Sequence, residues 1–250
     1  MLVKKPLIML VAMSCFIPCV SHAETKLKID LSSYVSKISD LTAEVIVEKV
    51  QPEILEKIGK DFGTPYLFKK LNLSYLSPDK IRLDGKSSVF GSALLIINGS
   101  QRLFSVPRLG QKGKEDLTKF PGKRLTSLEY LGILSKGTLD HLEAKESEPD
   151  LIESTKTLKL SLYFKETDHL IYRIWIDPKT NVVLKRVWYD NMGEPKATFL
   201  YSEITEVSKD IWLPGRVEIL NAKNESAAIT SIGHYMIDTH IKESLFEIAR

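Results

Sequence analysis

Histidines and carboxylates are the residue types in this chain that could carry acid-base chemistry or hold a metal ion. Four histidines follow the first 23 residues: His141, His169, His234 and His240. None of them falls in an HxH or HExxH spacing, and a pair such as Glu143 and Glu146 is equally typical of a solvated surface. The GxSxG, P-loop and GxGxxG motifs are also absent from the sequence. We therefore expect a binding protein that is not an enzyme and that needs no cofactor or metal.

The first 23 residues have the three parts of a secretory signal peptide. Lys4 and Lys5 form a positive start, residues 7–20 are apolar, and Ser21 and Ala23 place small residues where a signal peptidase cleaves. The apolar stretch is shorter than the roughly 20 residues that span a bilayer. We expect cleavage after Ala23, export to the periplasm, and no transmembrane segment in the mature chain.

The cysteine count follows from this expectation. Cys15 and Cys19 are the only two cysteines, and both lie within the predicted signal peptide. The mature chain would then contain no thiol, which excludes a disulfide, a cysteine nucleophile or a zinc-thiolate site. Its stability must come from a hydrophobic core, and residues 24–250 are long enough to form one large domain.

Net charge gives little indication of a partner. The chain has 35 Lys and Arg against 32 Asp and Glu, a formal net charge of +3. A nucleic-acid-binding protein would have a clustered basic stripe. We expect no nucleic-acid partner.

Most of the remaining sequence alternates apolar and polar residues in short runs, which is typical of antiparallel strands. Asn98-Gly99 is a strong hairpin signal, and Pro178 and Asn181 favour a type I turn. Helical spacing predicts short helices over 31–41, 52–62 and 242–249. The expected strands cover residues 42–50, 66–76, 80–84, 89–97, 102–106, 158–164, 170–176, 182–189, 196–206, 212–221 and 227–238.

Residues 112–146 interrupt this pattern. Their leucines recur mostly every three to six residues, which predicts two or three short helices. A curved sheet of ten or eleven strands must cover its apolar face, and these helices are the natural lid over its concave side. The lid residues expected to face the sheet are Leu117, Phe120, Leu128, Leu131 and Leu134. The predicted fold class is α+β, mainly antiparallel β.

Large apolar side chains of the strands are the remaining candidates for a binding site. Mostly apolar cavities with few polar groups are typical of lipid sites. The candidate lining residues are Phe90, Leu95, Phe104, Tyr172, Ile174, Trp175, Trp188, Phe199 and Trp212. The alternative for each residue is that it fills a solid core.

Several segments resemble the superfamily of periplasmic proteins that includes the LolA and LolB lipoprotein carriers and the RseB stress regulators. The carrier-like segments are Leu76–Leu83 (LSPDKIRL), Leu95–Gly99 (LIING) and Phe104–Pro107 (FSVP). The RseB-like segments are Tyr172–Asp177 (YRIWID) and Asp190–Gly193 (DNMG). These motifs are structural, and none is a catalytic signature.

The resemblance implies an unclosed β-barrel with a helical lid over an apolar cavity. It implies a periplasmic carrier that buries the acyl chains of a lipid or lipoprotein, with another envelope protein as a possible partner. In the carriers an arginine just before the proline helps to close the lid, whereas this chain has Ser77 before Pro78. The alternative is an RseB-like envelope sensor or protein-interaction module without carrier activity.

Overall fold

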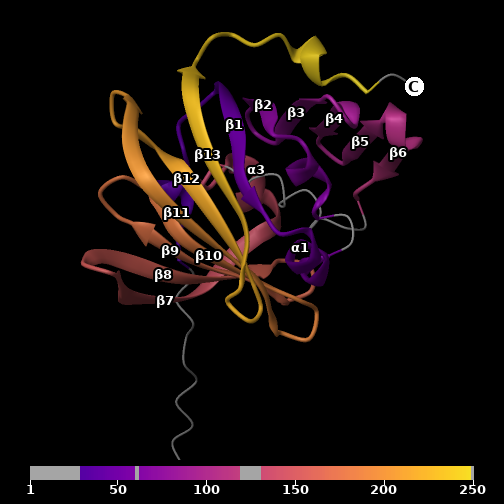
Figure 1. Cartoon of the computed structure of the whole chain (residues 1–250). Coiled ribbons are helices and arrows are strands. Elements are labelled where there is room, and N and C mark those ends of the chain that lie inside the picture. Colours follow the sequence, from indigo (N-terminus) through magenta and orange to yellow (C-terminus); the bar gives the residue numbers. More distant parts are fainter. Residues whose placement is uncertain (1–28, 60–61, 119–130, 249–250) are drawn as a thin grey trace, which may run out of the picture.

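A computed structural model describes residues 29–59, 62–118 and 131–248 of the chain. Thirteen strands form one antiparallel sheet in these residues (Figure 1). The strands are β1 (Asp40–Val50), β2 (Lys70–Leu76), β3 (Lys80–Ser87), β4 (Gly91–Asn98), β5 (Gln101–Val106), β6 (Gln111–Asp116), β7 (Leu142–Ile152), β8 (Thr155–Phe164), β9 (Leu170–Asp177), β10 (Val182–Tyr189), β11 (Pro195–Ser208), β12 (Ile211–Asn221) and β13 (Ser226–Ile237).

The helical elements are short. The α-helices are α1 (Pro52–Ile58) and α3 (Lys136–His141), and the 3₁₀ turns are η1 (Ser32–Tyr34), η2 (Thr64–Leu67), η3 (Pro107–Leu109) and η5 (Glu243–Phe246). Pro52 begins α1, where its missing N–H costs nothing, and the Ser135 side chain caps α3 by accepting a hydrogen bond from the Thr138 N–H.

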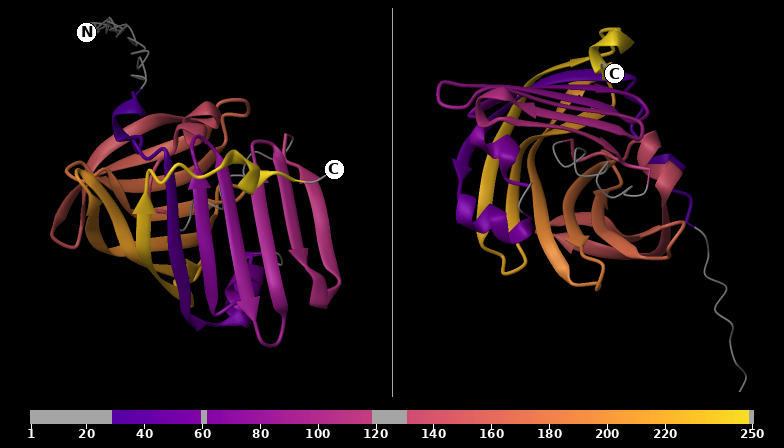
Figure 2. Two further views of the ribbon diagram at one scale, coloured as in Figure 1. Left: turned by 90° about the horizontal axis from the view of Figure 1, so that it is seen from above. Right: turned by 90° about the vertical axis from the view of Figure 1, so that its right-hand side faces the viewer.

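The sheet consists of two meanders joined by the pairing of β1 with β13. Its order is β6-β5-β4-β3-β2-β1-β13-β12-β11-β10-β9-β8-β7, and the described residues show no pairing between the edge strands β6 and β7. The sheet is therefore unclosed. Figure 2 shows that it curves strongly, so that β2–β6 lie across from β7–β11 with α1 and α3 near its inner side.

The turns form where the sequence supplies residues that tolerate a positive φ. Gly99 has φ 57° between β4 and β5, and Asn181 has φ 56° between β9 and β10. Both confirm the predicted hairpins, because glycine and asparagine adopt the left-handed conformation at low cost.

The predicted strand count of ten or eleven is wrong, since the structure has thirteen strands. The two additional strands, β6 and β7, lie at the ends of the segment 112–146 that was predicted to be helical. Both are edge strands, and every residue of β6 is exposed. Edge strands often carry charged residues that discourage pairing with other chains, so they lack the apolar period of a buried strand. Within 112–146, α3 is helical, and residues 119–130 lie outside the described residues.

Two smaller expectations also differ from the structure. Residues 31–41, predicted as a helix, form only the turn η1 before β1 begins at Asp40. Of the predicted helix 242–249, the described residues 242–248 form only η5. The single domain 24–250 remains a prediction, and the signal peptide lies outside the described residues.

The C-terminal segment, residues 238–248, crosses the outer side of the sheet (Figure 2, left). The Asp40 carboxylate accepts hydrogen bonds from the Thr239 N–H at 2.8 Å and the His240 N–H at 3.0 Å. Further along, Arg82 donates from Nη1 to the carbonyl oxygen of Leu245 at 2.9 Å. The Phe246 side chain is fully buried. This segment covers the outer side of β3 and β4.

Candidate functional site

The inner face of the sheet is defined by a row of cross-strand partners through six strands. Partners in adjacent strands point to the same face. The row runs Leu160, Ile174, Arg186, Phe199, Ile219 and Ala228, from β8 to β13. Its apolar members belong to the main buried cluster, which also includes Leu55 of α1. The inner face is therefore the side on which the helical segments pack.

An aromatic group connects the segment after α1 to the inner face. The Phe62 ring lies 5.9 Å from Tyr66, 6.2 Å from Trp188 and 6.2 Å from Phe199, measured between ring centroids. Phe199 is buried, whereas Phe62 and Trp188 are only partly buried against the main cluster. The group thus extends from the core to a partly open margin of the inner face.

Most of the predicted lining residues lie on the inner face or pack against its cluster. Tyr172 and Ile174 are buried members of the main cluster. Leu95 and Phe104 are cross-strand partners in β4 and β5, and both are partly buried against that cluster. Phe90 packs there too, with its ring centroid 6.3 Å from that of Phe68.

Two predicted lining residues are placed elsewhere. Trp175 lies on the outer face, in a second buried cluster with Val187 and Tyr189. It alternates with Ile174 along β9, so the two side chains point to opposite faces. Trp212 alternates in the same way with the buried Leu213, and it belongs to neither cluster among the described residues.

Three of the predicted lid residues are described, and all three are buried: Leu117, Leu131 and Leu134. Phe120 and Leu128 lie outside the described residues. Leu117 follows the edge strand β6, and Leu131 and Leu134 precede α3. Residues 117–141 connect the two edge strands, and their last part, residues 131–141, is called the covering segment below.

Backbone hydrogen bonds attach the covering segment to both halves of the sheet. Val183 at the start of β10 donates its N–H to the carbonyl oxygen of Gly132 at 2.8 Å. Gly137 donates its N–H to the carbonyl oxygen of Pro78, in the turn between β2 and β3, at 3.2 Å. The same turn contains Ser77. Contact between this turn and the covering segment therefore includes a hydrogen bond between backbone groups.

Arg186 is a charged residue on the inner face that was not among the predicted site residues. Its side chain is only 4% exposed on the inner face, and it lies over the rings of Tyr172 at 5.3 Å and Tyr201 at 5.8 Å. The sequence signal that could have identified Arg186 is its spacing of two residues from Trp188, because this spacing places both side chains on one face of β10.

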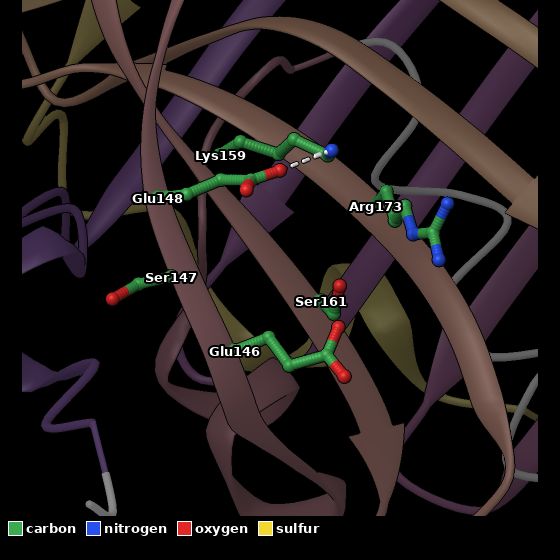
Figure 3. A pocket seen from close by; sticks show the side chains of 6 residues that line it. All are labelled: Glu146, Ser147, Glu148, Lys159, Ser161 and Arg173. Carbon is green, nitrogen blue, oxygen red and sulfur yellow. Dashed lines mark hydrogen bonds and ion pairs between the residues drawn. The ribbon is translucent and has the colours of Figure 1, made fainter.

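The outer face of β7, β8 and β9 contains a small polar pocket of about 250 Å³. Figure 3 shows its lining side chains, which are Glu146, Ser147, Glu148, Lys159, Ser161 and Arg173. Lys159 forms an ion pair with Glu148. On the same face the Trp175 indole N–H donates to Asp150 at 2.7 Å, and this hydrogen bond lowers the pKa of the Asp150 carboxyl. The pocket is thus lined by charged and polar side chains, one pair of which forms an ion pair.

The histidines do not converge on one place. His141 has its Nδ1 atom 4.0 Å from a Glu166 carboxylate oxygen, while the His240 backbone N–H donates to Asp40. Within residues 29–59, 62–118 and 131–248, no group of three or more His, Cys, Asp or Glu side chains is arranged to hold a metal ion. In the same ranges, no helix has the length and apolarity needed to cross a membrane.

Comparisons with known proteins support the fold. A family model described as "Uncharacterized protein" matches residues 135–250. No curated protein sequence matches the chain significantly. Similar solved structures include a LolA superfamily protein from Nitrosomonas europaea, with 10% identity, a TM-score of 0.58, and coverage of 86% of this chain and 93% of that one.

Two further solved structures are similar to this chain. A domain named for outer membrane lipoprotein sorting, from Vibrio parahaemolyticus, has 12% identity, a TM-score of 0.55, and coverage of 86% of this chain and 92% of its own. A DUF1329 family protein from Desulfovibrio piger has 12% identity, a TM-score of 0.51, and coverage of 85% and 91%. At these identities the likeness concerns the fold.

Proposed function

This chain has the LolA-like fold, and from that premise we propose that it is an exported, periplasmic protein that binds lipids or lipoproteins by burying their acyl chains. The binding site is the inner face of the sheet beneath the covering segment. The proposed role is binding and release without catalysis.

The observation that carries the proposal is the apolar row across the inner face together with the partly buried aromatic margin. The row takes one residue from each of six adjacent strands, so an extended acyl chain could lie across the sheet along it. Phe62 and Trp188 are partly exposed beside the buried Phe199. This margin supports a path by which an acyl chain could reach the inner face.

The hydrophobic effect supplies sufficient free energy for such binding. Each buried methylene contributes about 0.8 kcal/mol. About ten buried methylenes therefore correspond to the roughly 8 kcal/mol of a micromolar complex, before the costs of association are subtracted. One acyl chain is enough to give useful and reversible affinity.

Release would require the covering segment to move from the sheet. Backbone hydrogen bonds join it to Val183, Pro78, Ser36 and Lys165. The side chains of Leu131, Ile133 and Leu134 are also buried. A hydrogen bond contributes a net of about 1 kcal/mol and a buried leucine or isoleucine side chain about 1.5–3 kcal/mol. Opening therefore needs a ligand or a partner to offset the loss of these contacts. Ser77 stands where the carriers have their lid-closing arginine, so closure here would rely on these hydrogen bonds and on the buried side chains.

The proposal is tested with the mature protein after delipidation. Titration with a fluorescent C16 fatty acid should give saturable binding near one equivalent, and native mass spectrometry of undelipidated protein should show retained lipid. Absence of both would contradict the proposal.

The second candidate is an envelope sensor or protein-interaction module. It is favoured by one observation, namely that Tyr172, Phe199 and Leu134 are already buried by the chain itself. A partner captured equally well by the lipid-loaded and the lipid-free protein, with no acyl binding, would support this candidate.

A further inference from the structure

Arg186 is the charged member of the otherwise apolar inner row. Its cross-strand partners are Ile174 on one side and Phe199 on the other, and both are at most 2% exposed. Cross-strand partners share a face, so the guanidinium group extends from the same side of the sheet as these two side chains.

The guanidinium lacks an anionic partner in the part of the chain that the structure describes. Its recorded contacts there are the rings of Tyr172 and Tyr201, at 5.3 Å and 5.8 Å from the guanidinium carbon. A guanidinium keeps its charge, and burying a charge without a counter-ion is unfavourable. Cation–π contacts offset only part of this cost. The site therefore favours an anion.

Arg173 on the outer face has a similar ring contact but different surroundings. It lies 5.3 Å from the centre of the Tyr189 ring, and its cross-strand partner Val187 points outward. It also lines the outer pocket together with the carboxylates of Glu146 and Glu148. An arginine on this sheet is thus found near carboxylates on one face and among apolar groups on the other.

We propose that Arg186 binds the carboxylate of the acyl ligand, so that the preferred ligand is a long-chain fatty acid. This inference rests on the proposed function, since it places the acyl chain along the inner face beside Phe199 and Trp188. The planar guanidinium matches a carboxylate in bidentate geometry. A site whose arginine is 4% exposed favours a compact headgroup over a large one.

Three ligands with the same C16 chain test the proposal: palmitate, hexadecanol and hexadecyl phosphate. Isothermal titration of the delipidated wild-type protein should show palmitate binding roughly tenfold or more tightly than hexadecanol, the gain expected of a charge-assisted hydrogen-bonded pair. Hexadecyl phosphate carries a bulkier anion, so it should bind less tightly than palmitate. Equal affinity for palmitate and hexadecanol, or tighter binding of the phosphate, would overturn the fatty-acid assignment.

The variant Arg186→Met should bind palmitate about tenfold more weakly while hexadecanol affinity changes little. Arg173→Met is the matched control, because it removes an arginine from the adjacent strand on the opposite face, and it should keep the wild-type preference. If Arg186→Met does not fold, the wild-type comparison of the three ligands still decides the question. Binding of all C16 ligands without preference refutes the role of Arg186 and leaves the proposed function standing. Binding of none of them refutes both.

Discussion

Gly137 of the covering segment lies directly against Pro78 of the turn between β2 and β3. Its N–H donates to the Pro78 carbonyl oxygen at 3.2 Å, and a Cβ atom built on Gly137 would lie 2.8 Å from that oxygen and 2.7 Å from the Asp79 Cβ atom. The close approach that joins the covering segment to the sheet thus depends on glycine at this position.

Gly137→Ala should therefore destabilise the closed arrangement. Overpacking of this kind costs about 1–3 kcal/mol, and each kcal/mol lowers the Tm of a chain of this size by roughly 2–4 °C. Gly113→Ala is the control, since a Cβ atom there meets nothing within 4 Å. Thermal unfolding by circular dichroism measures both. A Tm for Gly137→Ala equal to that of the control would show that the segment does not depend on this contact.

The sequence predicts the interior strands well and the edges of the sheet poorly. The hairpin at Gly99 and the turn at Asn181 form as expected, because local chemistry determines them. Every residue of β6 is exposed. Its sequence therefore lacks the alternation of apolar and polar residues that marks a half-buried strand. The strand over 111–116 therefore becomes recognisable only when β5 pairs with it.

The candidate site was only partly predictable, because size and apolarity do not tell which face of a strand a residue occupies. Tyr172, Ile174 and Phe199 were selected by size and apolarity, and they lie in the main cluster. Trp175 was selected by the same criteria although the period of two already separates it from Ile174. Arg186 was missed because a charged residue in a strand is usually outward, and only the register with Ile174 and Phe199 reveals its burial.

Phe62→Ala should weaken acyl binding more than it weakens the fold. Phe62 is partly buried beside Trp188 and Phe199, so its removal opens the aromatic margin without creating a deep cavity. We expect a three- to tenfold loss of affinity, about 0.7–1.4 kcal/mol, for a fluorescent C16 fatty acid. Trp212→Leu, at a site outside the inner cluster, should leave affinity unchanged. Equal losses in both variants would argue against binding at this margin.

Asp40→Asn should loosen the C-terminal segment. The carboxylate is 3% exposed and accepts hydrogen bonds from the Thr239 N–H, the Thr239 hydroxyl and the His240 N–H. An amide offers one acceptor oxygen, so one of the two backbone N–H groups loses a part-buried hydrogen bond, which is worth about 1 kcal/mol net. Hydrogen exchange at residues 239–240 should accelerate, whereas Asp210→Asn in an exposed turn should not change it. Unchanged exchange in Asp40→Asn would contradict this role.

Stability should fall at alkaline pH because of Tyr235. Its hydroxyl donates to the Pro214 carbonyl oxygen at 2.6 Å, and burial raises the pKa of this phenol above its usual value of 10.0. A raised folded-state pKa gives a contribution that is fully present below about pH 10 and is lost as pH rises further. Urea unfolding between pH 9 and 11 should show a shallower decline for Tyr235→Phe than for the wild type. Identical slopes would remove Tyr235 as the cause.

Photo-crosslinking gives the most direct test of acyl binding on the inner face. A C16 fatty acid with a diazirine near its chain end is bound to the delipidated protein, irradiated, and located by peptide mass spectrometry. The predicted result is labelling of inner-row residues, among them Ile174, Phe199 and Ile219, that excess palmitate suppresses. Labelling confined to outer-face residues such as Trp175 and Trp212, or labelling that palmitate does not suppress, would contradict the account.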